Sequence, residues 1–264
     1  MKGFKFLLTL AVLVLFIAAC GTDDGGASEK EGSTGEDSGG QTYTVGIDTT
    51  YPPFEFEDSS GNYKGIDVDL IRAIAENQGF EVKLEPMDFG GIIPALQAGQ
   101  LDVAIAGMSI TDERKKIVDF SEPYFEAGLT LVSQKGNNEI KTLEDLKGKT
   151  VVVKSGTTGA QFAQDNKDKY EYEITVLEDS PSMFQEVSNG NADVLIEDYP
   201  VIAYAIAESN LDLKIVGDRL NGDHYGIAVL KGEHADLLDM INTGLQELKD
   251  SGKYDEILNT YISE

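Results

Sequence analysis

Apolar runs of strand length alternate with segments of helical period along most of the chain. The runs YTVGI (43–47), FEVKLEP (80–86) and LDVAIAG (101–107) are typical of buried strands. Between the first two, DVDLIRAIAENQG places Leu70, Ile71, Ile74 and Ala75 on one helical face and ends at Gly79, as helices commonly do. This alternation predicts an α/β architecture with mostly parallel sheets.

The same alternation continues to the C-terminus. We expect a helix around GIIPALQAG, strands in KTVVVK, ADVLIED and YGIAVLK, and helices in TTGAQFAQDN, SPSMFQEVSNG, HADLLDMINTGLQELKDSG and KYDEILNTYI. Ser180 or Ser182 would cap the helix of SPSMFQEVSNG. Two pairs of similar segments suggest that the chain forms two similar lobes. In QAGQLDVAIAG and SNGNADVLIED, a glycine is followed at the same distance by Asp-Val and an apolar strand, and TVGID resembles TVVVK.

The N-terminus has the layout of a secretory signal. Lys2 and Lys5 precede an uncharged run over 6–19, and the run ends in IAAC, which contains Cys20, the single cysteine. This small-residue triplet before Cys resembles the bacterial lipoprotein box. We therefore expect a signal peptide over 1–19, lipidation of Cys20 and a flexible tether over 20–42. An ordinary signal with an incidental cysteine is the alternative.

The charge balance excludes some partners. The chain has 47 acidic residues against 21 basic ones, with a formal net charge of −26. So acidic a surface argues against binding to nucleic acid or to anionic lipid.

Candidate binding residues follow the ends of predicted strands, where open α/β sheets bind their ligands. These ends are 48–51, 106–114, 154–159 and 197–199. If two lobes face each other, Arg114 and Asp48 from one lobe meet Lys154 and Asp198 from the other. Such a cleft suits a ligand with both charges, such as a free amino acid.

Arg114 is the most informative of these residues. GMSITDERKK (107–116) places it in what reads as the first turn of a helix, whose partial positive charge favours an anion there. The planar guanidinium matches a carboxylate with two hydrogen bonds, and Ser109 would add a donor. The alternative is a surface ion pair with Asp112 or Asp119.

Three segments carry a family resemblance over about residues 43 to 262. YPPFEFEDSSGNYKGIDVDLIRAIA, MDFGGIIPALQAGQLDVAIAGMSITDERKKIVDFSEPYF and VVVKSGTTG resemble the polar amino acid solute-binding proteins of ABC importers. MDFGGIIPAL and the lysine of VVVKSGT are most similar to the glutamine-binding subfamily. The resemblance implies a type II periplasmic-binding-protein-like fold with two hinge crossovers, near 124–130 and 220–227. Lobe 1 would comprise 43–126 and 223–264, and lobe 2 would comprise 127–222.

The resemblance also implies a role for each site residue. Arg114, Ser109 and Thr158 would bind the carboxylate, while Asp198 and the Gly107 carbonyl would bind the ammonium. Tyr51 and Phe89 would sandwich the aliphatic part, and Asp48 and Lys154 would meet the side-chain tip. The remaining expected ligand-binding residues are Ala106, Thr157 and Glu197.

The expected ligand is L-glutamine, because its carboxamide satisfies both Asp48 and Lys154 without adding charge. Glutamate would oppose Asp48, and arginine would oppose Lys154. The alternative is that Asp48 and Lys154 pair with each other across the closed cleft. Glu197 departs from the glutamine-binding pattern, which has histidine there, and an extra carboxylate favours arginine.

The expected role is a monomeric, non-enzymatic receptor, lipid-anchored outside the bacterial cell membrane, that delivers its ligand to an ABC transporter permease. No cofactor and no metal are expected. A lyase on the same fold is one rival, with Glu197 as general acid, although His224 and His234 lie far apart in the chain. The other rival is a ligand-sensing lipoprotein.

Overall fold

The first sheet combines strands from both ends of the part of the chain that the structure describes. The computed structural model describes residues 40–209 and 211–262; the predicted signal peptide, Cys20 and nearly all of the tether lie outside them. The sheet has the order β5-β1-β6-β15-β7. Its strands are β5 (Glu81–Pro86), β1 (Thr42–Ile47), β6 (Val103–Ala104), β15 (Ala228–Leu230) and β7 (Val118–Phe120).

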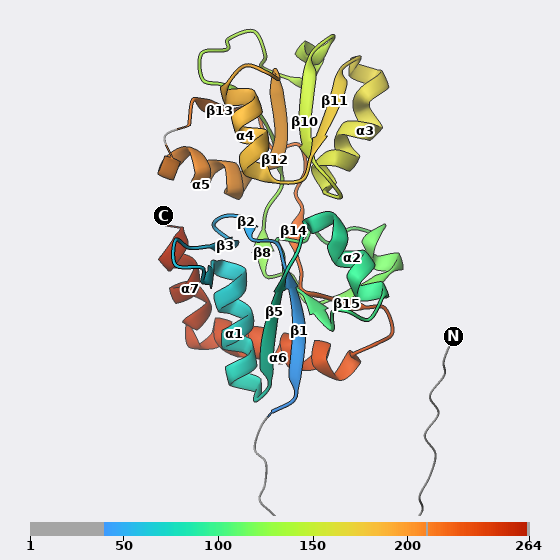
Figure 1. Ribbon diagram of the computed structural model, residues 1–264, viewed down its shortest axis with the longest axis vertical. Coiled ribbons are helices and arrows are strands. Elements are labelled where there is room, and N and C mark those ends of the chain that lie inside the picture. The colour runs from blue at the N-terminus through green and yellow to red at the C-terminus, as the bar shows by residue number, and fades with distance from the viewer. Residues whose placement is uncertain (1–39, 210, 263–264) are drawn as a thin grey trace, which may run out of the picture. The chain divides into compact units, whose positions relative to one another are not determined.

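The second sheet repeats this arrangement within the middle of the chain. Its order is β11-β10-β12-β9-β13 (Figure 1). The strands are β11 (Glu173–Leu177), β10 (Thr150–Lys154), β12 (Val194–Asp198), β9 (Leu129–Gln134) and β13 (Leu213–Val216). We call the parts built on the two sheets the first and the second lobe. The predicted two-lobed α/β fold is therefore confirmed.

The sheets are mixed. In the first, β1 runs parallel to β5 and β6, whereas β15 runs antiparallel to β6 and β7. In the second, β10 runs parallel to β11 and β12, whereas β9 runs antiparallel to β12 and β13. Each antiparallel strand directly follows a crossover: β9 follows the first and β15 follows the second. After each crossover the chain therefore runs opposite to the parallel strands of the sheet that it joins.

Two short strands join the lobes. β8 (Phe125–Glu126) and β14 (His224–Tyr225) pair antiparallel between the two sheets, as Figure 1 shows. They lie within the segments expected to cross between the lobes. A two-strand connection of this kind permits the hinge motion that this class of fold uses to close on a ligand.

Helices cover both sheets. Around the first sheet lie α1 (Ile66–Gln78), α2 (Phe89–Gln97), α6 (Ala235–Ser251) and α7 (Lys253–Tyr261), and around the second lie α3 (Thr158–Tyr170), α4 (Ser180–Ser188) and α5 (Tyr199–Ser209). α1 ends as predicted, at Gly79 in the left-handed conformation with φ 76°. Its predicted apolar face is buried at Leu70, Ile71, Ile74 and Ala75.

Two local predictions were wrong. Asp179, and not Ser180 or Ser182, caps α4, because its carboxylate accepts the backbone N–H of Ser182 at 2.7 Å. Arg114 does not open an α-helix. Arg114–Lys116 form only a three-residue 3₁₀ turn, so the argument from a helix dipole does not hold there and the position of Arg114 needs another explanation.

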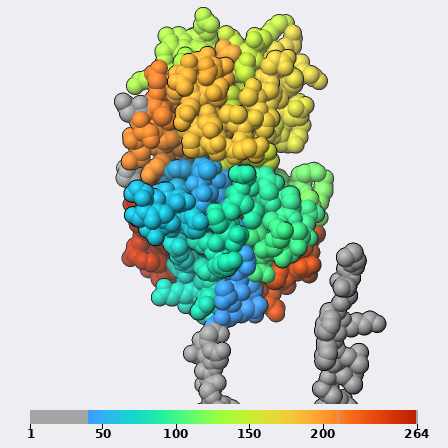
Figure 2. Space-filling view, in the orientation of Figure 1, coloured from blue at the N-terminus to red at the C-terminus, as the bar shows by residue number. Residues whose placement is uncertain are grey.

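The lobes approach each other closely at two glycines. Figure 2 shows yellow and orange atoms of the second lobe lying directly against blue and green atoms of the first. At this boundary a Cβ on Gly156 would stand 2.9 Å from the Cα of Gly90 on α2. Gly156 also has φ +73°, a conformation that side chains rarely adopt.

We predict that Gly156→Ala disturbs the contact between the lobes. Gly148→Ala is the matched control, since Gly148 has φ +71° and no atom near its Cβ direction. Both variants bear the left-handed cost of roughly 1–2 kcal/mol, but only Gly156→Ala meets backbone. Small-angle scattering should show a larger radius of gyration for Gly156→Ala than for Gly148→Ala. Otherwise, denaturant unfolding should show that Gly156→Ala loses more stability than Gly148→Ala. Equal behaviour of the two variants in both measurements would contradict the prediction.

Candidate functional site

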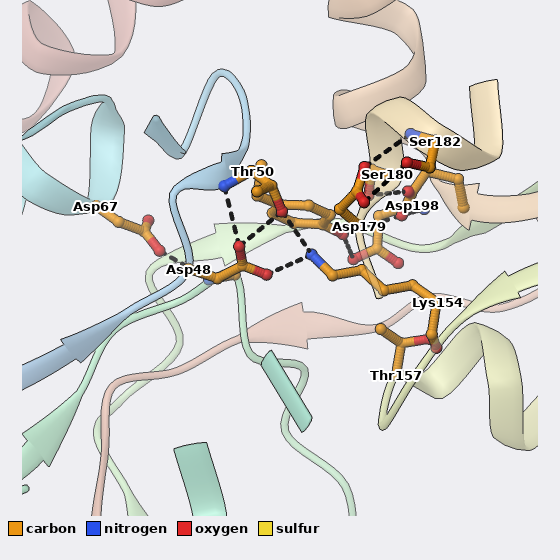
Figure 3. Close-up of polar contacts among 12 residues, drawn as sticks. Asp48, Thr50, Asp67, Lys154, Thr157, Asp179, Ser180, Ser182 and Asp198 are labelled. Carbon is orange, nitrogen blue, oxygen red and sulfur yellow. Dashed lines mark hydrogen bonds and ion pairs between the residues drawn. The ribbon is translucent and has the colours of Figure 1, made fainter. Parts of the chain in front are cut away.

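The predicted site residues gather where the two lobes meet. Asp48 directly follows β1 of the first lobe, while Lys154 and Asp198 end β10 and β12 of the second. The ion pair between Lys154 and Asp48 joins the carboxyl ends of β1 and β10 (Figure 3). Strand ends from both sheets therefore face one boundary, which is the position expected for a ligand site in α/β proteins.

A small cavity lies at this boundary. Its volume is about 10 Å³, the space of roughly one water molecule. An amino acid is much larger, so the side chains or the lobes have to move apart to admit one. All the residues that line this cavity belong to the predicted set: Tyr51, Phe89, Gly107, Ser109, Arg114, Lys154, Thr157, Thr158 and Asp198.

The other three predicted residues lie beside the cavity without lining it. Ala106 is buried next to Gly107, in the apolar cluster that contains α2. Asp48 and Glu197 are also buried and contact residues that do line the cavity.

Arg114 is buried, with 9% of its surface exposed. Its guanidinium donates to the carbonyl of Ser109 at 2.8 Å and, across the boundary, to the carbonyl of Gly156 at 3.1 Å. The alternative surface pairing with Asp112 or Asp119 is not what holds it. Burial lowers the pKa of Arg114, an effect opposed by the negative charges of Asp198 and Asp223. An anion bound here would therefore relieve an unfavourable environment for the cation.

Asp198 is held by two tyrosines from outside its own lobe, Tyr51 of the first lobe and Tyr225 of the crossover strand β14. Its Oδ2 accepts the hydroxyl of Tyr51 at 2.6 Å and that of Tyr225 at 2.5 Å. Burial raises the pKa of Asp198, and these two hydrogen bonds oppose the rise. A cation beside Asp198 would stabilise the charged carboxylate in the same way.

Glu197 points to the other side of β12, toward α4. Its Oε2 accepts the Ser180 hydroxyl at 2.6 Å, and its Oε1 lies within hydrogen-bond distance of the Asp198 N–H at 2.9 Å and the Tyr51 hydroxyl at 3.2 Å. Burial, and then the charge of Asp198, raise the pKa of Glu197 to about 7. Glu197 is thus a buried acid that can gain or lose a proton near neutral pH.

Lys154 and Asp48 form a buried ion pair, with side chains 2% and 3% exposed. The Oδ1 of Asp48 also accepts the N–H of Thr50 at 2.9 Å and its hydroxyl at 2.7 Å. The structure therefore contains the alternative arrangement, in which Asp48 and Lys154 pair with each other across the cleft. Lys154 keeps donor capacity for a further partner, since an ammonium has three N–H groups.

Aromatic rings flank both cations of the site. The Nζ of Lys154 lies 4.8 Å from the centre of the Tyr51 ring and 5.9 Å from that of Phe89. The guanidinium carbon of Arg114 lies 5.1 Å from the Phe89 ring centre. Tyr51 and Phe89 therefore form apolar walls between the cationic groups, as expected for residues that enclose the aliphatic part of a ligand.

Gly107 and the start of α3 supply backbone groups. Gly107 has φ +53°, and a Cβ there would stand 2.7 Å from the Tyr51 ring, so the position requires glycine. Thr157 caps α3 by accepting the N–H of Ala160 at 3.1 Å, and Thr158 is the first residue of the helix. The N-terminus of this 13-residue helix is a favourable place for an anion.

The sequence reading missed two residues at the site. Tyr225 was treated only as part of a strand, yet its hydroxyl binds Asp198; Ser180 was treated as a possible helix cap, yet its hydroxyl binds Glu197. Ser180 lies 17 residues from Glu197 in the chain. Neither contact has a local signal, because each joins segments that only the folded chain brings together.

A larger groove adjoins the small cavity. It has a volume of about 540 Å³ and shares Arg114, Thr157 and Thr158 with the cavity. Half of its other twelve lining residues have apolar side chains, and these come from both lobes: Ile93, Ile117, Val153, Ala160, Ile174 and Val176. The groove therefore reaches the boundary beside Arg114.

Two kinds of feature are absent from the described residues. They contain no group of three side chains placed to hold a metal ion. None of their helices has the length and apolar character needed to cross a bilayer.

The chain is similar to known amino-acid-binding proteins. The ABC transporter glutamine-binding protein GlnH of Bacillus subtilis (strain 168) is 34% identical over 272 residues, with 100% of this chain and 98% of GlnH covered. Other relatives of about 30% identity are named histidine-, arginine- and cystine-binding proteins. The relatives thus agree on the class of ligand and differ in the amino acid.

Solved structures give the same result. An ancestral arginine-binding protein bound to arginine is 47% identical with a TM-score of 0.79, and covers 84% of this chain and 98% of its own. Another structure, described as an ancestral arginine-binding protein bound to glutamine, has the same identity and coverage with a TM-score of 0.78.

A family model matches residues 43–264, most of the chain. Together with the relatives above, this match identifies the chain as a member of the bacterial extracellular solute-binding proteins, family 3.

Proposed function

We propose that this protein is a receptor for L-glutamine that passes its ligand to an ABC importer. The observation that carries the proposal is that groups of both charges meet at one cavity. Arg114, Lys154 and Asp198 line the cavity together with Thr158, the first residue of α3, and the charge of Lys154 is balanced by Asp48. These groups match the carboxylate, the ammonium and the side chain of one amino acid.

The ligand carboxylate would bind between Arg114 and α3. The guanidinium now donates to two carbonyl oxygens, which are weaker partners than a carboxylate. Exchanging the Gly156 carbonyl for a ligand carboxylate would give the buried cation an anionic partner. Ser109 and Thr158 would contribute additional donors at the same end.

The ligand ammonium would bind Asp198. The hydroxyls of Tyr51 and Tyr225 both donate to Oδ2 of this residue, which leaves capacity on Oδ1 for a third donor. The Gly107 carbonyl would be the second acceptor, since Gly107 lines the same cavity. A buried Asp198 that gains a cation is stabilised in its charged form.

The side chain would meet Lys154 and Asp48, whose charges cancel each other. A carboxamide can accept from Lys154 and donate to Asp48, so glutamine leaves the pair balanced. A glutamate side chain would add a negative charge near Asp48 and Glu197, and an arginine side chain would add a positive charge near Lys154. Like charges in close contact cost on the order of several kcal/mol.

Arginine is the second candidate. An ancestral structure with 47% identity is named for arginine, and a related one contains glutamine. In addition, Glu197 brings a third carboxyl group to a site with two cations. If Glu197 is ionised when ligand is bound, it would offset part of the repulsion between Lys154 and a guanidinium.

The proposed role is binding and delivery without catalysis. The relatives reported above are named as binding proteins, although one structural neighbour is described as a precursor of cyclohexadienyl dehydratase. Family members are extracellular proteins. We propose that this chain acts as a monomer anchored by a lipid on Cys20, so that the receptor stays close to the transporter permease.

We predict that glutamine binds more tightly than any other amino acid. Titration calorimetry with all twenty amino acids measures this directly, and a stronger response to arginine or glutamate would overturn the choice. The Lys154→Gln variant sharpens the test. Because it removes the cation that repels arginine, the affinity for arginine should rise relative to the affinity for glutamine. An unchanged ratio would show that Lys154 does not select the side chain.

We predict that Arg114→Ala and Asp198→Ala each weaken ligand binding by roughly 2–5 kcal/mol, because each leaves one charge of the ligand unpaired in a buried site. The matched controls are Arg219→Ala and Asp119→Ala, which remove partly exposed groups in surface ion pairs. Calorimetry gives the affinity, and thermal unfolding checks that the variants fold. An affinity within a factor of ten of the unmodified protein, less than about 1.4 kcal/mol, would show that the site is misplaced.

We predict that ligand affinity rises as the pH rises through about 7, the pKa of Glu197. A ligand ammonium beside Asp198 adds positive charge near Glu197 and lowers that pKa. The complex therefore holds fewer protons than the free protein, and binding releases protons and is favoured at higher pH. Calorimetry in buffers of different ionisation enthalpy measures the release. Glu197→Gln should reduce it, and equal release by both proteins would exclude Glu197 as the source.

A further inference from the structure

Two carboxyl groups are buried together behind the ligand site. Glu55 begins β3 (Glu55–Glu57), and Asp67 lies in the first turn of α1; neither has any exposed surface. The backbone N–H of Asp67 donates to the carbonyl of Phe54 at 2.9 Å, which places Asp67 beside Glu55, and the charge of Asp67 raises the pKa of Glu55. No step of amino-acid binding uses either one directly, so their burial needs a separate reason.

Within the part of the chain that the structure describes, hydrogen-bond donors reach only one of the four carboxyl oxygens of this pair. The Oδ2 of Asp67 accepts the N–H of Gly107 at 2.7 Å and the hydroxyl of Tyr124 at 2.8 Å. Among the described residues, the Oδ1 of Asp67 and both oxygens of Glu55 meet no N–H or O–H donor. A proton on Glu55 gives partners to two of these three oxygens, because a protonated Glu55 can donate to Oδ1 of Asp67. Asp67 then accepts three hydrogen bonds as a carboxylate.

The surrounding charges favour that proton on Glu55. Burial, followed by the charges of Asp67 and Asp48, raises the pKa of Glu55 well above its ordinary value, against the lowering effect of Lys154. The pKa of Asp67 rises only to about 6, because burial is opposed by hydrogen bonds from Gly107, Glu55 and Tyr124. Two tyrosine hydroxyls are further titratable groups near Asp67: that of Tyr124, which donates to it, and that of Tyr254 on α7.

The two groups that donate to Asp67 belong to two different regions, the ligand cavity and the first crossover. Gly107 lines the ligand cavity in a left-handed conformation against Tyr51. Tyr124 directly precedes β8 of the first crossover, and its backbone N–H donates to the carbonyl of Tyr225 in β14 of the second, at 3.0 Å. The carbonyl of Tyr124 in turn accepts the hydroxyl of Tyr254. Asp67 thus links the ligand loop to the first crossover, while the backbone pairing of Ser109 with Tyr225 links the same loop to the second.

We propose that Asp67, supported by a proton shared with Glu55, is a positioning residue that fixes Gly107 for the ligand ammonium and ties this loop to the hinge at Tyr124. The part that concerns the ammonium rests on the proposed function. The part that concerns the buried proton and the Gly107 N–H does not, and it has its own measurement.

The first test compares Asp67→Ala and Asp67→Asn with Asp69→Asn. Asp69 is the matched control, because it lies in the same helical turn and also accepts a tyrosine hydroxyl, that of Tyr261 at 2.6 Å. Asp67→Ala should weaken binding of L-glutamine by about tenfold or more. Asp67→Asn, which keeps an uncharged acceptor, should weaken it by about threefold. The control should bind as the unmodified protein does.

The second test needs no ligand. Amide hydrogen exchange at Gly107 should be faster in both Asp67 variants than in Asp69→Asn, in the order Ala, then Asn. If Asp67→Ala fails to fold, Asp67→Asn still decides the point. Exchange at Gly107 equal to that of the control would overturn the proposal whatever the ligand is. Faster exchange in a protein that binds neither glutamine nor arginine would instead contradict the proposed function alone.

The third test concerns the proton. Because the folded protein holds a proton on Glu55 that the unfolded chain loses near its ordinary pKa of 4.5, stability falls as the pH rises above that value. Glu55→Gln keeps a donor toward Asp67 and cannot ionise. Its melting temperature should therefore fall less between about pH 5 and 8 than that of the unmodified protein. Parallel pH profiles of the two proteins would show that no proton is shared.

Discussion

The contact between the lobes depends on pairing the buried charges at the boundary with groups from outside their own lobe. Lys154 meets Asp48 and Arg114 meets the Gly156 carbonyl, while Asp198 meets the tyrosine hydroxyls at 51 and 225. An uncompensated buried charge is very unfavourable, whereas a paired one contributes little net stability. The paired charges therefore fix how the two lobes fit together but add little stability to the contact between them. This suits lobes that have to separate and close again.

The pairing of buried charges explains how the site can keep charged groups available for a ligand without leaving them unpaired beforehand. The guanidinium and the carboxylate that the proposal assigns to ligand binding already have partners, so a ligand exchanges hydrogen bonds instead of creating them in an empty space. Net affinity then depends on the difference between the partners. A carboxylate is better for Arg114 than two carbonyl oxygens, and an ammonium is better for Asp198 than a hydroxyl. The gain comes from charge complementarity.

Sequence reasoning located the parts of this site that follow from regular structure. Parallel strands bring their carboxyl ends together, so Asp48, Lys154 and Asp198 could be predicted from the apolar runs before them. Contacts between segments without periodic patterns could not be predicted: the hydroxyl of Tyr225 reaches Asp198 from a crossover strand. The α-helix expected at Arg114 failed for a related reason. Three residues of 3₁₀ turn give no pattern, and burial between lobes, not a helix dipole, makes an anion favourable there.

The proton on Glu55 is the least visible feature in the sequence and the most dependent on the fold. Glu55 occurs in FEFE, where two glutamates alternate with phenylalanines and nothing in the pattern distinguishes one glutamate from the other. The fold distinguishes them, because Glu55 is buried in β3 while Glu57 is exposed. A glutamine at 55 would avoid the cost of keeping a carboxyl group neutral. A glutamine would accept and donate as well, but it cannot release a proton, so only a carboxyl group at position 55 can change its charge when the hydrogen bonds of Asp67 change.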